Sequence, residues 1–104
     1  MIDISWKDDY YDRAFPAIYK IYIGEHIYIG STKRNARDRI SEHIRLLKQN
    51  KHYNYKMQDW FNEIKIASFY IIEYPKVENI VEREQFWINK LKPDINIIQN
   101  VANY

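Results

Sequence analysis

Two tyrosines stand close together in the stretch "AIYKIYIGEHIYIGS", residues 17–31. A two-residue type II′ turn that starts at Gly24 would join two strands here, because its first central position requires a positive φ. In that register Tyr19 lies opposite Gly30 and diagonal to Tyr28, on the same face and roughly 7–8 Å away. Tyrosine is also common in strands, so both rings could simply pack the sheet. The hairpin therefore predicts two phenols beside an open space above a glycine.

A cationic pair follows on a helix predicted over residues 36–48. Apolar residues recur there at helical spacing, and Asn35 fits the N-cap position. Arg39 and His43 are four residues apart, so they lie side by side at one edge of the apolar stripe, where they could face a cleft. The alternatives are that Arg39 pairs with an acidic neighbour on its own helix and that His43 is an ordinary surface residue.

An acidic residue interrupts the apolar stripe of another predicted helix, residues 77–91. Glu84 takes a position between Val81 and Trp87 where an apolar side chain is expected. An ionised carboxylate removed from water needs a cation, a metal ion or several hydrogen-bond donors to offset the loss of hydration. The alternative is a glutamate at the rim of the core, paired with a lysine. Because the chain has no cysteine, any metal here would be a hard ion such as Mg²⁺.

The remaining elements complete a small α+β domain. A helix is predicted over residues 55–64 with Asn54 as its N-cap, and a strand over residues 67–74 that ends at Pro75. A closing segment, residues 94–98, then returns along the sheet. The predicted fold is a three-stranded, mainly antiparallel sheet, made of the N-terminal hairpin and one further strand and flanked by about three helices.

Length and composition indicate one domain. The chain has 104 residues, of which 46% are hydrophobic, enough for a single core. Residues 1–16 are acidic and aromatic and are interpreted as an N-terminal arm, and residues 17–104 as the domain itself. No apolar run approaches the roughly 20 residues that span a bilayer, and the first residues lack the pattern of a signal peptide. We therefore expect a cytoplasmic protein that is not secreted and has no membrane partner.

The net charge of +2 is spread unevenly along the chain. Residues 17–56 carry nine basic residues against three acidic ones, which gives +6. A basic region of that size is what a polyphosphate such as a nucleic acid would bind. The alternative is a solvated helix face with scattered lysines.

Six chemically competent residues occur in an order that resembles the GIY-YIG nuclease domain family: Tyr19, Tyr28, Arg39, His43, Glu84 and Asn96. The similarity covers roughly residues 17–98 and includes the strings "RDRISEH", "EREQFWINKLKP" and "DINI". It is closest to the catalytic module of phage-type homing endonucleases and their free-standing relatives. One position departs from the family pattern, because Ala17 stands where the first glycine of the family name is expected. A methyl group fits there only if φ is not positive.

The resemblance implies a phosphodiesterase that uses one divalent ion, Mg²⁺ or Mn²⁺. Glu84 would be the only protein ligand, with water and phosphate oxygens around the ion. Tyr19 would act as general base or pass the proton on, for which nearby positive charge must lower its pKa from about 10. Tyr28 would orient the attacking water, and Arg39 would stabilise the charge that develops on the phosphate. His43 would accept a proton or hold Tyr19 in place.

The resemblance also assigns supporting residues. Gly30 and Asn96 would support the site structurally. His52 aligns with a histidine of the homing-type branch and could contact the substrate or belong to the site; the alternative is an exposed loop histidine without a role. Basic residues that could hold phosphates without reading bases are Lys33, Arg34, Arg37, Arg45 and Lys48.

The expected function is therefore an endonuclease that hydrolyses DNA phosphodiester bonds one strand at a time. Its intrinsic sequence specificity would be weak, so it would act as a homodimer, with a specificity partner protein, or on a structural feature of DNA such as a branch or nick. It would do so in a bacterial or virus-infected host cell. Two alternatives remain open. One is a catalytically silent DNA-binding module that retains the nuclease fold, and the other is a protein-interaction scaffold that uses the arm.

Overall fold

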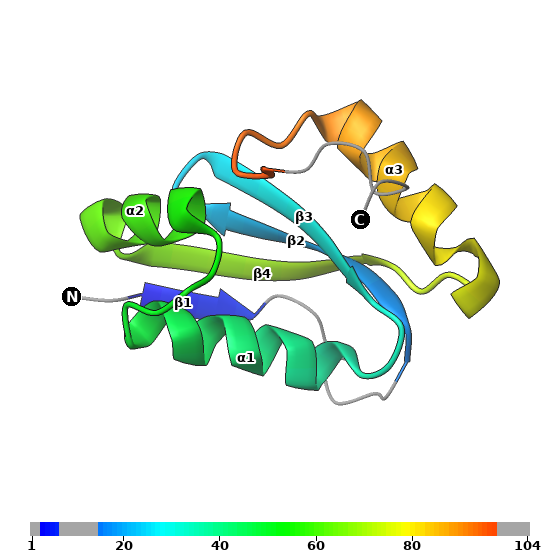
Figure 1. The fold of residues 1–104 in the computed structure, drawn as a ribbon, viewed down its shortest axis with the longest axis horizontal. Helices are drawn as coiled ribbons and strands as arrows, with labels where there is room; N and C mark the ends of the chain where they lie inside the picture. The colour runs from blue at the N-terminus through cyan, green and yellow to red at the C-terminus, as the bar shows by residue number, and fades with distance from the viewer. Residues whose placement is uncertain (1–2, 7–14, 98–104) are drawn as a thin grey trace.

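The computed structural model describes residues 3–6 and 15–97. Four strands form one sheet: β1 (Asp3–Trp6), β2 (Ala17–Ile23), β3 (His26–Thr32) and β4 (Ile66–Glu73). The helices are α1 (Ala36–Lys48), α2 (Tyr55–Ile64), the short 3-10 helix η1 (Val77–Asn79) and α3 (Ile80–Leu91) (Figure 1). Within the described ranges no helix has the length and apolar character needed to cross a bilayer.

β2 and β3 form the antiparallel hairpin in the predicted register, with Tyr19 opposite Gly30 and Ile21 opposite Tyr28. Gly24 has a φ of 60°, as a type II′ turn requires at its first central position. β4 pairs antiparallel with the other side of β2. The predicted α+β fold with a three-stranded antiparallel sheet is thus confirmed.

β1 adds a fourth strand that the sequence does not predict. It pairs parallel with β4, and the strand order is β1-β4-β2-β3. Residues 3–6 belong to the stretch interpreted as an arm, which mixes aromatic and acidic residues and so gives no clear strand pattern. Residues 1–2, 7–14 and 98–104 lie outside the described residues, and with them most of the arm and the last residue of the predicted closing segment.

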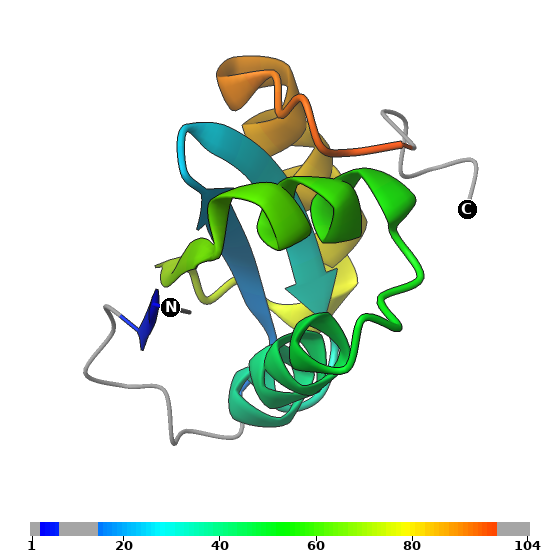
Figure 2. The ribbon, with the colours of Figure 1, turned by 90° about the vertical axis from the view of Figure 1, so that its left-hand side faces the viewer.

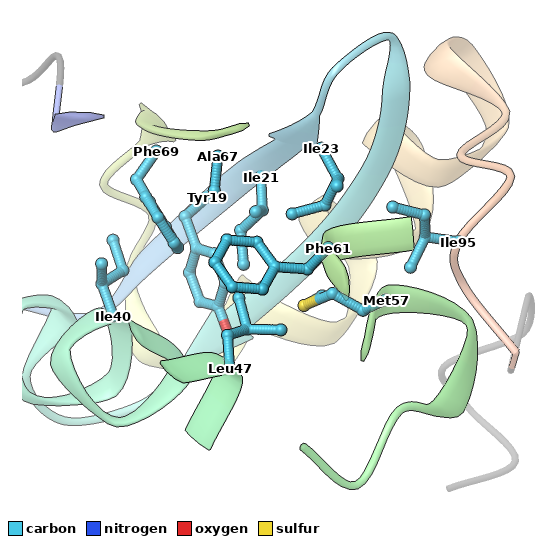
Figure 3. Packing of buried hydrophobic residues seen from close by; sticks show 10 residues of the cluster. All are labelled: Tyr19, Ile21, Ile23, Ile40, Leu47, Met57, Phe61, Ala67, Phe69 and Ile95. Carbon is cyan, nitrogen blue, oxygen red and sulfur yellow. The ribbon is translucent and has the colours of Figure 1, made fainter. Parts of the chain in front are cut away.

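The side chains of β2 alternate between two cores, one on each face of the sheet. On one face, Tyr19 and Ile21 pack with Ile40 of α1 and with residues of α2 (Figure 3). On the other face, Ile18 packs with Ile88 of α3. Two helices therefore cover the face that carries Tyr19, and α3 covers the opposite one. Figure 2 shows α1 nearly end-on, with α2 above it.

α1 and α2 begin where the sequence predicts because asparagine side chains cap them. The Asn35 side chain accepts a hydrogen bond from the N–H of Asp38 (3.2 Å), and the Asn54 side chain accepts one from Met57 (3.0 Å). Each bond satisfies an amide that the first turn leaves without a helical partner. The helix predicted over 77–91 starts with the single 3-10 turn of η1.

Two side-chain clamps fix α3 and the closing segment against the sheet. Glu73, at the end of β4, accepts hydrogen bonds from Arg83 on both carboxylate oxygens (2.8 Å each) and from the Trp87 indole (3.0 Å). The Asn96 amide pairs with Ile29 of β3, accepting from its N–H (2.8 Å) and donating to its carbonyl (2.9 Å). The closing segment therefore runs along β3, as predicted.

Candidate active site

Tyr19 lies inside the core, with 1% of its surface exposed. The pairing of β2 with β4 shifts register between Ile18 and Tyr19, a bulge of the kind often found beside functional sites. The ring lies directly over Gly30, where an added Cβ would come within 2.6 Å of the Tyr19 hydroxyl. The prediction of an open space above Gly30 is therefore wrong, because the Tyr19 ring fills it.

Tyr28 lies on the same face as Tyr19, as predicted. The two ring centroids are 6.5 Å apart, with the planes tilted by 38°. Tyr28 is half-buried and packs against the core cluster of which Tyr19 is a member. The hairpin thus presents one enclosed phenol and one half-buried phenol side by side.

His43 is fully buried, at 0% exposure, and contacts Tyr19 directly. Its Nε2 lies 2.8 Å from the Tyr19 hydroxyl, and its Nδ1 lies 2.7 Å from Nε2 of His52. His52 is itself buried, at 7% exposure. Neither the surface role considered for His43 nor the exposed loop position considered for His52 is found.

Arg39 stands one turn before His43 on α1 and is partly exposed. Its Nη1 donates a hydrogen bond to Glu42 (3.0 Å), so the pairing with an acidic neighbour on its helix does occur. Its Nη2 donates to the hydroxyl of Tyr53. The Arg39 charge is also near enough to lower the pKa of Tyr19. The same guanidinium therefore pairs with Glu42 on its own helix and acts on Tyr19 in the site.

Burial dominates the ionisation of Tyr19. It raises the pKa of the phenol well above 10, the charge of Tyr28 adds to this, and Arg39 acts in the opposite direction without compensating. Removing a phenolate from water is costly unless charge and hydrogen bonds replace its hydration. With the charges of the protein alone, Tyr19 is therefore a neutral phenol at pH 7.

Glu84 is buried on α3, at 3% exposure, as its place in the apolar stripe suggests. Its Oε1 accepts a hydrogen bond from the hydroxyl of Ser31 on β3, so the carboxylate points toward the hairpin. Ser31 lies opposite Ile18 and therefore on the α3 face, whereas Tyr19 lies on the other face. β3 is one of the two edge strands, and the Tyr19 ring lies over Gly30 of that strand, so Tyr19 and Glu84 approach β3 from opposite faces. The Glu84 charge raises the pKa of Tyr19.

The side chains around Glu84 suit a metal ion that keeps most of its water ligands better than one coordinated by several protein side chains. Among residues 3–6 and 15–97, no group of three or more His, Cys, Asp or Glu side chains could together hold a metal. A buried carboxylate beside a hydroxyl fits Mg²⁺, which usually keeps several waters and binds through one or two carboxylates. A zinc site with several protein ligands would not fit these residues.

The basic residues predicted to contact phosphates lie on the surface, in the connection after β3 and along α1. All five are exposed: Lys33, Arg34, Arg37, Arg45 and Lys48. They share this part of the chain with Arg39 and His43. Their exposure leaves their charges available to a polyanion.

Residues 17–97 match the family model of the GIY-YIG catalytic domain. The chain belongs to the GIY-YIG family. It is also similar to the solved structure of the catalytic domain of the homing endonuclease I-TevI, with a TM-score of 0.69 and 30% sequence identity. That match covers 78% of this chain and 92% of the other. No match was found among curated proteins.

The departure from the GIY-YIG pattern at Ala17 fits the backbone. Ala17 is the first residue of β2 and is fully buried, at 0% exposure. Among the described residues, positive φ outside glycine occurs only at Asn50, Lys65 and Lys92. Position 17 therefore does not need the conformational freedom of glycine, and the methyl group packs in the core.

Two residues of this GIY-YIG site do not stand out in the sequence. Ser31 is one residue beyond the "YIG" string, and its role depends on how Glu84 reaches across from α3. Tyr53 stacks on His52 with ring centroids 4.4 Å apart and accepts the hydrogen bond from Arg39, yet it is 56% exposed. The signal that the sequence offers for Tyr53 is its position next to His52. An exposed tyrosine in a loop does not belong to a helical or strand pattern that would single it out.

Proposed function

We propose that this protein is a divalent-metal-dependent endonuclease that hydrolyses DNA phosphodiester bonds. The observation that carries the proposal is the gathering of a tyrosine pair, an arginine, a buried histidine and a buried carboxylate around one hairpin in a GIY-YIG chain. Membership of the family supports a nuclease. The likeness to a homing endonuclease catalytic domain supports DNA as the substrate.

Each side chain has a role that its position allows. Glu84 would hold the ion, which would supply Lewis-acid stabilisation of the phosphate and a more acidic water. Arg39 would place a fixed positive charge where negative charge develops on the phosphate. Tyr28, on the exposed side of the phenol pair, would orient the attacking water, and Tyr19 would take its proton. The surface basic residues would hold the DNA backbone without selecting a sequence.

Cleavage would proceed one strand at a time, because one such site can attack one phosphodiester at once. Phosphate contacts without base contacts give weak sequence preference. A second copy of the chain or a specificity partner would then be needed for a defined double-strand cut.

Supercoiled plasmid nicking in the presence of Mg²⁺ or Mn²⁺ tests the proposal. We expect Glu84→Gln to lower the nicking rate by roughly 100-fold or more, since it removes the charge that would hold the ion but keeps the side-chain size. Glu82→Gln is the matched control, because Glu82 is an exposed carboxylate on the same helix. Nicked circles should appear before linear DNA.

Three outcomes would contradict the proposal. Equal nicking by wild type and Glu84→Gln would remove Glu84 as the ion ligand. Linear DNA from the earliest time point would contradict strand-by-strand cleavage. Salt-dependent DNA binding without cleavage in any divalent ion would identify a silent DNA-binding module instead.

A further inference from the structure

A chain of hydrogen bonds leads from the backbone into the Tyr19 hydroxyl. The N–H of Asn54 lies 3.0 Å from Nδ1 of His52. Nε2 of His52 lies 2.7 Å from Nδ1 of His43, and Nε2 of His43 lies 2.8 Å from the Tyr19 hydroxyl. We call these four groups the Asn54–Tyr19 hydrogen-bond chain. Its three histidine and tyrosine members are all buried.

The direction of this chain follows from its first member. A backbone amide can only donate, so Nδ1 of His52 must accept and the proton of a neutral His52 must sit on Nε2. That proton is donated to Nδ1 of His43, which leaves the His43 proton on Nε2 as well. His43 then donates to the oxygen of Tyr19. Each bond thereby fixes the tautomer of the next ring.

The reverse direction would place two donors against each other. A proton on Nδ1 of His52 would face the Asn54 N–H at 3.0 Å, with no acceptor between them. The amide cannot turn away, because the Asn54 side chain caps α2 through Met57 (3.0 Å) and donates to the carbonyl of Ile95 (3.2 Å). The backbone N–H of His52 is likewise held by Gln58 (3.0 Å).

Both histidines are also held in the neutral form that this arrangement requires. Burial is the largest cause, and the nearby Arg39 charge acts in the same direction. Together they lower the pKa of His43 well below 6.5 and the pKa of His52 to about 4. Both imidazole rings are therefore neutral at pH 7, with one proton each.

We infer that His43 donates a hydrogen bond to the Tyr19 oxygen, and so acts as a positioning residue that stabilises the phenolate rather than as the acceptor of the Tyr19 proton. This rests on the proposed function of Tyr19 as the base. The Tyr19 proton leaves on the side away from His43 to solvent water. The phenolate then takes one proton from the attacking water as the new oxygen–phosphorus bond forms and the bond from phosphorus to the leaving sugar oxygen breaks, which restores the phenol. The leaving alkoxide takes up one proton from solvent, equal to the one that Tyr19 released. His43 and His52 stay neutral throughout, and the proton count balances.

The tautomers can be read directly from the full chain by ¹⁵N–¹H correlation spectra of the imidazole rings near pH 7.5. We expect the proton on Nε2 for both His43 and His52, with His26 as an internal comparison outside the Asn54–Tyr19 hydrogen-bond chain. A proton on Nδ1 of either ring, or an imidazolium signal from either, would overturn the inference. No DNA or metal is needed, so this result stands whether or not the protein proves to be a nuclease.

Two variants separate a donor from a proton acceptor. Glutamine at position 43 can accept from His52 and donate to Tyr19, but it cannot take a proton near neutral pH. We expect His43→Gln to keep at least about one tenth of the wild-type nicking rate, and His43→Leu to lose about 100-fold or more. If His43→Gln, shown to be folded, is as inactive as His43→Leu, His43 is the proton acceptor and the inference fails. If Glu84→Gln nicks as fast as the wild type but both histidines show the expected tautomers, only the proposed function is contradicted.

Discussion

Burial of titratable side chains sets the chemistry of single residues in this protein. Tyr19, His43 and His52 are enclosed together, so the phenol and both rings are held neutral by the same loss of hydration. Hydrogen-bond partners then decide where each proton sits. The nearby Arg39 charge acts on all three groups, which ties the ionisation of the core to a residue that reaches the surface.

Stability should therefore depend on pH in a particular window. His52 has a folded pKa of about 4 against 6.5 when unfolded, so the unfolded chain binds more protons between these values. The stabilisation from neutral His52 is complete above about pH 6.5 and declines as the pH falls toward 4, and His43 shifts in the same direction. Thermal unfolding at about pH 7.5 and about pH 5 should show a lower midpoint at the acidic pH.

His52→Gln is the matched control for this prediction, since glutamine does not titrate. Its midpoint should fall less between the two pH values than that of the wild type. An identical fall in both proteins would show that His52 does not titrate on unfolding in this range. The pKa of Asp94 is lowered from 3.8 and that of Glu73 from 4.5, so both groups titrate mainly below about pH 5, the lower of the two pH values compared.

At this scale the sequence predicts which residues share a face but not what encloses them. The position of Gly24 is enough to place Tyr19 and Tyr28 together. That the Tyr19 ring fills the space over Gly30, and that His52 lies inside, depends on how α1 and α2 pack on the sheet. Such tertiary contacts leave no periodic signal in the chain.

At the scale of elements, the hairpin and α1 hold the tyrosine pair through close packing. Gly30 has no room for a side chain: an added Cβ would lie 2.6 Å from the Tyr19 hydroxyl and 2.8 Å from its Cε2. The Tyr19 ring cannot move away cheaply, because it is buried and bonded to His43. The hairpin therefore positions Tyr19 by direct contact as well as by register.

Gly30→Ala should accordingly destabilise the protein by about 1–3 kcal/mol, the usual cost of overpacking, and should lower nicking through displacement of Tyr19. Denaturant unfolding measures the first effect. In a Tyr19→Leu background the same substitution should cost less, since the ring that it meets is gone. Equal costs in both backgrounds would show that the strain lies elsewhere.

The helices and their caps could be predicted from the sequence because apolar spacing and asparagine caps are local signals. The burial of Glu84 was predicted in the same way, from the stripe of α3. The face of the sheet on which α3 packs could not be predicted from the sequence. Because α3 packs on the face opposite the phenols, Glu84 lies against Ser31. β1 was missed because a parallel partner far along the chain, β4, defines it rather than any local pattern.

At the scale of the whole molecule, charge is concentrated where the proposed DNA contacts lie. The strand–helix connection and α1 expose Lys33, Arg34, Arg37, Arg45 and Lys48. Binding of such a surface to DNA releases counterions, so affinity should fall steeply with salt.

Arg34→Gln and Arg37→Gln should each weaken DNA binding and reduce the slope of log affinity against log salt by about 0.9. Fluorescence anisotropy with a labelled duplex at several salt concentrations measures this. Lys65→Asn is the control, because Lys65 is exposed between α2 and β4, and asparagine tolerates its φ of 62°. An unchanged slope in both arginine variants, or an equal change in the control, would contradict a phosphate-binding face along α1.

The pairing of Asn96 with Ile29 has a consequence for assembly. A side-chain amide there occupies the donor and acceptor that a neighbouring strand would use, and β3 is one margin of the sheet. That margin is thus shielded at its middle against recruitment of further strands, which protects the domain from edge-to-edge aggregation. Two copies that meet on DNA would have to associate through side-chain surfaces, or by strand addition at the four-residue β1, leaving the hairpin undisturbed.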